Sequence, residues 1–323
     1  MSYFRNHNNY FHGIMFHHFH DKTIHKTSQG SISKDDFYKI IKYIGRENII
    51  NSDEFIYRIN ENSLKDNHLC LTFDDSLRCQ YDVALPVLEE LKIKSFFFIY
   101  SSIFEKQPDL LEVYRYFRIN YFGDINEFYF SFFKKVPYNL KEFFLKNKDK
   151  INMYEKKFPY YSINDIKFRL IRDYLISQYE YKTIMREMFD EKNCKQNSFD
   201  QILFLNSKHV NTLSKLGHQI GLHSHSHPTR LEKLSYEDQY RDYKKNLDTL
   251  QAIMPKDKSI NSMSHPCGSY NNDTLNILKK LNIELGFKQT LEIEPERGMK
   301  KINNSSLEIA RQDHSIILKE LTK

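Results

Sequence analysis

The feature of this sequence that most restricts its fold is a strand–helix–strand pattern in residues 68–102. It begins with a buried apolar run that ends in two acids, HLCLTFDD (68–75). A short segment with helical spacing follows, VALPVLEELKI (83–93), and then a second apolar run, KSFFFIYSS (94–102). Two buried strands joined by a helix form a βαβ unit, and such units place their strands parallel in one sheet.

The same alternation of strands and helices continues on both sides of this unit. The run at 13–19 can be a strand, and residues 33–45 have helical spacing, with Ser33 as N-cap and Gly45 as the stop. Later predicted elements are a helix at 206–217, a strand at 218–225, a helix at 235–254 that begins with a Ser235/Asp238 capping pattern, a strand at 259–266, a helix at 272–282, and strands at 283–289 and 306–314. Repeated β–α units with chemistry at the strand ends predict a distorted (β/α) barrel of the TIM type.

Residues 104–205 interrupt the pattern. Stretches such as INEFYFSFFKKV indicate helices and lack the alternation of strands. We therefore expect a single barrel domain over residues 1–323 with a mostly helical insertion at about 104–205. Its Phe and Tyr side chains are expected to form a small core of their own, although an insertion beside a barrel mouth could also be a lid or a dimer face.

The composition argues against several classes of protein. The chain is 40% hydrophobic and 28% charged, and its net charge of +6 is spread over Lys and Arg residues dispersed among acids, so we expect no nucleic-acid partner. The four cysteines show no CxxC spacing and are expected to be reduced thiols. Neither a signal peptide nor an apolar run long enough to span a bilayer is evident, so we expect a cytoplasmic protein without a transmembrane segment.

Two polar motifs that follow predicted strands could form one metal site. Asp74 and Asp75 end the run TFDD, and adjacent acids after a buried strand are costly unless a cation or a proton shares them. His223 and His227 in GLHSHSHPTR project to the same side in either a helix or a strand, although in a strand His225 would share that side. One carboxylate with two imidazoles is a standard arrangement for a hydrolytic zinc. Taken singly, the acids could cap a helix and the histidines could be a surface cluster.

A third motif, SHPCGSYN (264–271), follows a predicted strand at the same end of the sheet. Pro-x-Gly followed by Tyr-Asn is a turn signature, and most such segments are only turns. A turn in this place could present a backbone N–H to a developing oxyanion.

Together the three motifs resemble the polysaccharide deacetylases of carbohydrate esterase family 4. That family is marked by a TFDD strand end, then by H-[ST]-x-x-H, and then by an Arg-x-Pro-aromatic-Gly turn. Here TFDD is intact, HSHSH fits the second motif without a gap, and the order matches. MFHHFH near the start is also similar to the first-strand Tyr-His run of many members. The resemblance covers roughly residues 10–103 and 206–318.

The resemblance implies a role for each matching residue. Asp74 would be the general base that activates water. Asp75, His223 and His227 would hold a divalent metal ion, with Zn²⁺ as the expected ion, and His225 would lie beside the site. These residues would make the chain a metal-dependent hydrolase.

The third motif and the general acid are matched less closely. The backbone amide of Cys267, with Gly268, would form the oxyanion hole, and Tyr270 would contact the substrate from the same turn. The aromatic residue of the family motif is replaced by Cys267 itself, and its Arg is Ser264.

The last strand offers replacements for the missing groups. In ARQDHSII we expect Arg311 to replace the family's Arg beside Asp74, and His314 to be the general acid. His17, in the first strand, is the rival for the acid role and otherwise a substrate contact.

The sequence thus predicts a metal-dependent deacetylase that removes an N-acetyl group from an amino sugar. We expect a step in the synthesis of a bacterial surface polysaccharide of lipopolysaccharide or capsule type, on a carbohydrate that is nucleotide-linked, lipid-linked or part of a growing glycan. A homo-oligomer is possible. The same site could serve an O-acetyl esterase or a non-sugar amidohydrolase, and loss of the motif Arg leaves open a non-catalytic, metal-stabilised carbohydrate-binding barrel.

Overall fold

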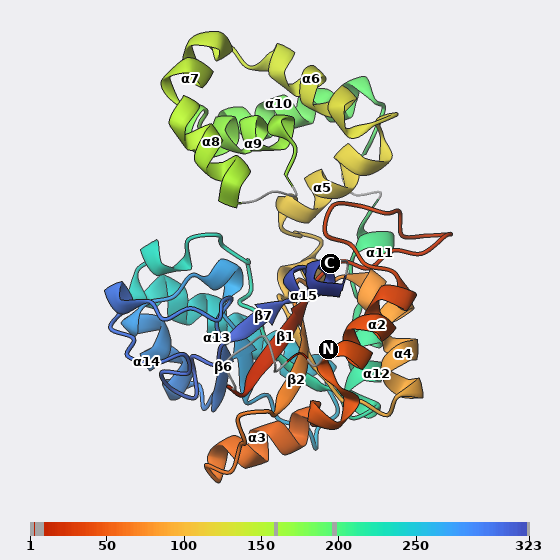
Figure 1. Cartoon of the computed structure of the whole chain (residues 1–323), viewed down its shortest axis with the longest axis vertical. Coiled ribbons are helices and arrows are strands. Elements are labelled where there is room, and N and C mark those ends of the chain that lie inside the picture. Colours follow the sequence, from red (N-terminus) through yellow and green to blue (C-terminus); the bar gives the residue numbers. More distant parts are fainter. Residues whose placement is uncertain (1–2, 4–9, 158–160, 196–198, 322–323) are drawn as a thin grey trace. The chain divides into compact units, whose positions relative to one another are not determined.

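The computed structural model describes residues 3, 10–157, 161–195 and 199–321. Over this part of the chain, seven strands form one sheet in the order β6-β5-β4-β3-β2-β1-β7 (Figure 1). The strands are β1 (His12–Phe16), β2 (Leu69–Phe73), β3 (Phe96–Ile99), β4 (Gln219–Leu222), β5 (Ser262–Ser264), β6 (Leu285–Phe287) and β7 (Arg311–Asp313). Every pairing is parallel, as the βαβ pattern predicts.

The sheet is nearly closed into a barrel because the chain just before β7 bonds to β6. The main-chain N–H of Ile309 donates to the O of Gly286 at 2.8 Å, and the N–H of Lys288 donates to the O of Ile309 at 2.9 Å. β7 itself pairs with β1. The expected distorted (β/α) barrel of the TIM type is confirmed, in a seven-stranded and nearly closed form.

Helices surround the sheet (Figure 1). Those of the barrel are α2 (Lys34–Ile44), α3 (Ser52–Asn60), α4 (Leu85–Glu90), α11 (Asp200–Leu203), α12 (Ser207–Lys215), α13 (Tyr236–Ile253), α14 (Asn272–Lys280) and α15 (His314–Leu321). The predicted caps are present: Ser33 and Ser235 each accept from a main-chain N–H in the first turn, and Gly45 ends α2. Among the described helices, none has the length and apolar character needed to cross a membrane.

Helix α3 closes the end of the barrel at which the strands begin. The segment leading into it is bonded there, since Ile50 N–H donates to Leu69 O at 2.9 Å and Ser52 N–H donates to Lys94 O at 3.0 Å. Its apolar face joins one cluster of the barrel core, which consists of Phe55, Ile56, Cys70, Phe96, Phe98, Leu285, Phe287 and Ile309. The carboxyl ends of the strands are therefore the end left for a functional site, as is usual in such barrels.

Residues Leu110–Phe199 form a second compact unit, and the barrel unit consists of Met1–Asp109 and Asp200–Lys323. The helices of the second unit are α5 (Leu110–Asn120), α6 (Ile125–Lys135), α7 (Leu140–Lys146), α8 (Lys148–Lys157), α9 (Ile163–Leu170) and α10 (Gln178–Glu191), with a π-helical turn at Ile171–Leu175. Aromatic side chains form its core; Phe117, for example, stacks on Phe189 with ring centroids 3.9 Å apart. The Phe- and Tyr-rich stretches thus pack on one another within this unit.

Gly221 in β4 occupies a position where a larger side chain does not fit. A Cβ atom there would lie 2.5 Å from the ring of Phe98 and 2.8 Å from the main-chain O of Ser262. We expect Gly221→Ala to lower the free energy of unfolding by about 1–3 kcal/mol, the cost of overpacking a well-packed core. Gly123→Ala is the control, because a Cβ there meets only the carboxylate of Glu127, at 3.3 Å. Equal denaturation midpoints for the two variants would contradict this prediction.

Candidate active site

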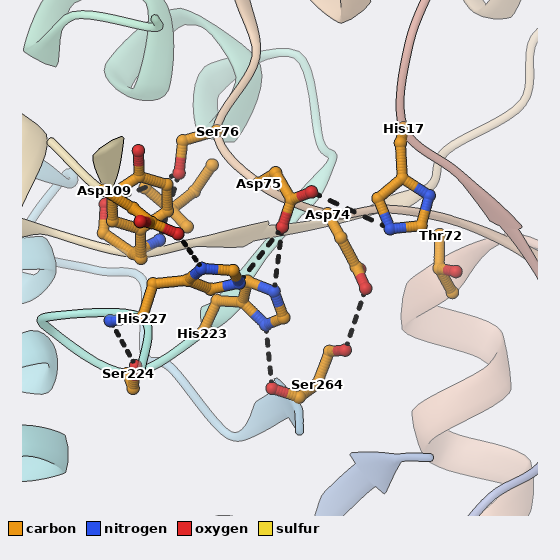
Figure 2. A network of polar contacts seen from close by, with 12 residues as sticks. His17, Thr72, Asp74, Asp75, Ser76, Asp109, His223, Ser224, His227 and Ser264 are labelled. Carbon is orange, nitrogen blue, oxygen red and sulfur yellow. Dashed lines mark hydrogen bonds and ion pairs between the residues drawn. The ribbon is translucent and has the colours of Figure 1, made fainter. Parts of the chain in front are cut away.

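Three side chains converge at the carboxyl ends of β2 and β4 and could hold a metal ion (Figure 2). Asp75 follows β2, and His223 and His227 follow β4. The Nε2 atoms of both histidines lie 3.3 Å from Oδ1 of Asp75. One possible ligand atom from each residue lies within 4.8 Å of the others. The structure therefore brings together the three candidate ligands that the sequence predicts.

The second nitrogen of each imidazole ring faces an oxygen acceptor. His223 Nδ1 lies 2.9 Å from the main-chain O of Ser264, and His227 Nδ1 lies 2.8 Å from Oδ2 of Asp109. An Nδ1–H that donates to oxygen leaves the lone pair of Nε2 free to bind a metal ion beside Asp75. Two imidazole nitrogens and one carboxylate oxygen are a donor set typical of zinc and related divalent cations, so these residues fit such an ion.

The pKa shifts of Asp75 and His227 also favour a positive charge between these side chains. Burial alone would raise the pKa of Asp75, but hydrogen bonds with His223 and His227 hold it well below its usual value. Burial would likewise lower the pKa of His227, but its contacts with Asp109 and Asp75 hold it well above its usual value. A bound cation would supply the positive charge that these side chains stabilise.

His225 lies beside this group and not in it. Its Nδ1 is 2.8 Å from Oγ of Ser101, and its Nε2 is 3.6 Å from Oε2 of Glu105. The strand ends before His223, so the alternation of a strand no longer decides the direction of the side chains that follow. The ambiguity that the sequence leaves between three equivalent histidines is thereby removed.

Helix α13 holds the main chain of the histidine loop. Asn246 Oδ1 accepts a hydrogen bond from the N–H of His223 at 3.1 Å. One turn earlier, Asp242 accepts hydrogen bonds from the main-chain N–H groups of His225 and Ser226, at 2.6 and 3.2 Å. The two polar side chains are four residues apart and therefore on one face of the helix.

A second buried cluster is centred on Asp74, the neighbour of the first ligand. Arg311 pairs with both of its oxygens, Nη1 with Oδ1 and Nη2 with Oδ2, each at 2.8 Å. Oγ of Ser264 donates to Asp74 Oδ2 at 3.1 Å and accepts from Arg311 Nη2 at 2.7 Å. The structure thus brings Arg311 to Asp74, and Ser264, which stands in the place of the motif Arg, completes the contact.

The surroundings of this pair keep Asp74 ionised. Burial alone would raise the pKa of Asp74, but the charges of Arg311 and His223 hold it below its usual value. Arg311 is itself held in place, since its Nε donates to the main-chain O of Lys288 at 2.8 Å. Gly13 makes room for its stem, because a Cβ at Gly13 would lie 3.0 Å from Arg311 Cγ.

The turn of the third motif places Cys267 near the ligand group. Cys267 is exposed and is the second residue of a 3₁₀ turn, Pro266–Gly268. The first N–H groups of such a turn have no acceptor within it, so the amide of Cys267 can donate to another group. The thiol interacts electrostatically with His227 and Asp75, which indicates that the turn borders the ligand group.

Tyr270, in contrast, is not brought to the site, which corrects the expectation that it contacts substrate. Its side chain is buried, its ring stacks on His265 with centroids 4.1 Å apart, and its hydroxyl donates to Glu308 at 3.2 Å. Gly268 also serves the turn, since it has a φ of +66° and a Cβ there would lie 2.9 Å from the side chain of Gln289. Both residues shape the turn that carries Cys267.

The two candidates for the general acid lie in different surroundings. His17 follows β1, its side chain is 23% exposed, and its Nε2 lies 3.8 Å from Oδ2 of Asp75 (Figure 2). His314 is buried at the start of α15, with Nδ1 3.1 Å from Met15 O and Nε2 3.1 Å from Gly30 O. Both nitrogens of His314 thus face main-chain carbonyls, so of the two candidates only His17 lies with a ring nitrogen near the ligand group.

An acid on the neighbouring strand accompanies His17. β7 pairs with β1 so that Asp313 lies opposite Met15. Burial would raise the pKa of Asp313, but the charges of His314 and His17 hold it below its usual value. An ionised carboxylate therefore lies close to His17.

Asp109 and Asn246 are the residues of this site that the sequence analysis misses. Asp109 directly precedes α5, where an Asp commonly caps a helix, so no local pattern distinguishes it. Asn246 is fully buried on α13. A polar residue on the apolar face of a predicted helix is a signal that hydrophobic patterning could have provided.

Comparison with known proteins now identifies the family. The family model for polysaccharide deacetylase matches residues 61–117 and 180–286, which include all three motifs. The chain belongs to the polysaccharide deacetylase family. Its activity class is accordingly that of a deacetylating hydrolase with a carbohydrate substrate. None of the curated proteins compared with the chain matches it.

Solved structures of polysaccharide deacetylases share this fold. The Streptococcus pyogenes deacetylase PplD, in complex with acetate, is 16% identical with a TM-score of 0.56, covering 97% of this chain and 96% of its own. A de-N-acetylase from Aggregatibacter actinomycetemcomitans is 13% identical with a TM-score of 0.53, covering 96% and 98%. IcaB from Ammonifex degensii is 12% identical with a TM-score of 0.51, covering 94% and 91%. At these identities the likeness concerns the fold.

The geometry of this polysaccharide deacetylase predicts that substitution of its three histidines affects metal binding differently. We expect His223→Ala and His227→Ala each to lose a tightly bound divalent ion, since each removes one of three converging ligands. His225→Ala should retain the ion, because its ring contacts Ser101 and Glu105. Metal content after dialysis measures the difference. Equal loss in all three variants would show that the ligand group is wrongly assigned.

The Asp74–Arg311 pair predicts how activity depends on pH. Arg311 lowers the pKa of Asp74, so its removal in Arg311→Met should raise that pKa. The acidic limb of kcat/KM should then move to higher pH, while Arg311→Lys, which keeps a positive charge, should shift it less. Metal content determined at each pH separates loss of the base from loss of the cation. An unmoved acidic limb in a fully loaded Arg311→Met variant would exclude this role.

Proposed function

We propose that this chain is a hydrolase that removes an N-acetyl group from an amino sugar with the help of a divalent cation, Zn²⁺, held by Asp75, His223 and His227. The observation that carries the proposal is the position of Asp74. It is a buried, ionised carboxylate next to the ligand group, and a binding protein would have no use for such a base.

Asp74 is suited to act as the general base because one of its lone pairs remains available. An ionised carboxylate has about four acceptor positions on its two oxygens. Arg311 takes one on each oxygen, and Ser264 takes a second one on Oδ2. Oδ1 therefore keeps a position from which Asp74 can accept a proton from the attacking water.

His17 is suited to act as the general acid. Its partly exposed ring after β1 lies on the other side of Asp75 from His223 and His227 (Figure 2). The carboxylate of Asp313 supplies negative charge nearby. In its protonated form His17 can donate a proton to the departing amine.

The remaining requirement is stabilisation of the oxyanion. A divalent cation at the three ligands supplies Lewis-acid polarisation of the acyl carbonyl and makes water more acidic. The free amide of Cys267 is suited to donate a hydrogen bond to the developing oxyanion. Cys267 is exposed, so a carbohydrate can approach the turn at this residue.

The polysaccharide deacetylase family supports a polysaccharide as the target, and solved neighbours support an amide linkage. One solved neighbour is described as a de-N-acetylase, and another is a deacetylase in complex with acetate. We infer that the substrate is an N-acetylated sugar of a bacterial surface polysaccharide or its nucleotide- or lipid-linked precursor. A cytoplasmic location and a homo-oligomeric state stay predictions from the sequence.

Acetate release tests this function directly. Purified protein loaded with Zn²⁺ should release acetate from at least one member of a panel of N-acetylated sugars, free, nucleotide-linked and polymeric. Asp74→Asn should lower kcat by about 10²–10⁴-fold, the usual contribution of a general base, while it keeps the metal. Acetate release from O-acetylated sugars alone would assign an esterase instead. No acetate from any compound, with the metal bound, would refute the proposal.

A further inference from the structure

We propose that Asp109 is a positioning residue for the metal ligand His227 and holds this ring with Nε2 directed at Asp75. The inference rests on the proposed function, because it concerns the same ligand group. Asp109 Oδ2 lies 2.8 Å from His227 Nδ1, and the two side chains are 19% and 5% exposed. Figure 2 shows this contact at one ring nitrogen and the contact with Asp75 at the other.

The two imidazole ligands differ in the group that supports them. His223 Nδ1 faces the neutral main-chain carbonyl of Ser264, whereas His227 Nδ1 faces the carboxylate of Asp109. A carboxylate attracts the Nδ1 proton more strongly than a carbonyl does, and the ring then becomes a better electron donor through Nε2. His227 should therefore be the stronger of the two ligands, for a reason that lies outside the family motifs.

The loop that follows β3 keeps Asp109 in place. The N–H of Ser102 donates to the main-chain O of His225, and the N–H of Gln107 donates to the O of Ser102, each at 3.0 Å. The loop is thus bonded to the histidine loop near its start and, through Asp109, at its end. Because both loops belong to the barrel unit, the contact is part of one compact body.

The test measures the affinity of the whole chain for Zn²⁺ by competition with a chromophoric chelator, which requires neither substrate nor turnover. We expect Asp109→Ala to weaken Zn²⁺ binding by about 10- to 100-fold, as removal of such supporting groups usually does. Asp109→Asn should weaken it less, since the amide oxygen can still accept the Nδ1 proton.

Glu105→Gln is the matched control for loss of negative charge. Glu105 lies on the same loop but faces His225, with its Oε2 3.6 Å from Nε2 of that ring. This variant should keep the affinity of the wild type for Zn²⁺. In the Zn²⁺-loaded protein, the Nδ1 proton of His227 should give a protected NMR signal that is lost in Asp109→Ala and retained in Glu105→Gln.

The outcomes separate this inference from the function on which it rests. Wild-type affinity in both Asp109 variants, or an equal loss of affinity in Glu105→Gln, would overturn the role of Asp109. If Asp109→Ala does not fold, Asp109→Asn decides, and unchanged affinity in that variant would overturn the inference. A wild-type chain that binds no divalent cation would overturn the proposed function itself.

Discussion

The ion pair between Asp74 and Arg311 in the interior of the barrel is the interaction on which the rest of the site depends. Both side chains are almost completely buried, and removal of two charges from water offsets much of their attraction. The pair is tolerated because the barrel supplies further acceptors: Arg311 also donates to the main-chain O of Lys288 and to the hydroxyl oxygens of Thr72 and Ser264. Thr72 lies in β2, Ser264 lies in β5, and Lys288 directly follows β6. Three strands in addition to β7 therefore hold the guanidinium of Arg311 in place. What the pair contributes is the position and the charge of Asp74, more than stability of the fold.

The same pair explains how two adjacent acids are accommodated. Asp74 points into the barrel toward Arg311, whereas Asp75 has a φ of +71° and turns toward His223 and His227. Each carboxylate therefore has its own positive or hydrogen-bonding partners, and both have a lowered pKa. The turn is strained, and so are its neighbours at this end of the sheet; the residues with positive φ here are Asp75, Ser76, Ser224, His227 and Cys267. Such conformations cost about 1–3 kcal/mol each and persist only where the surroundings determine them, as the contacts from α13 do for the histidine loop.

Local pattern accounts for what the sequence predicts correctly. Buried strands that alternate with helices require a parallel sheet, and the carboxyl ends of parallel strands meet at one edge, so Asp75 and the two histidines can be expected to converge. Arg311 could be expected beside Asp74 because the family position for this charge is empty at Ser264. The sequence does not predict the positions of residues that depend on side-chain direction and on packing between distant segments. His314 begins a helix that the pattern does not reveal, and Tyr270 turns into the core under its own turn. Asp109 meets His227 only through the folded arrangement of two loops.

The distribution of charge then gives each acid a separate task. Arg311 neutralises Asp74 and engages both of its oxygens, which opposes the movement of this carboxylate toward a cation at the ligand group. Asp75 and Asp109 instead direct their carboxylates at the two imidazole rings, Asp75 at Nε2 of His223 and Asp109 at Nδ1 of His227. A divalent ion bound by Asp75 and the histidines would thus meet a negative environment from which Asp74 is held back. Without the guanidinium, the carboxylate of Asp74 would be held less firmly away from the cation. The buried pair therefore supports both proposed roles, the metal binding by Asp75 and the proton transfer by Asp74.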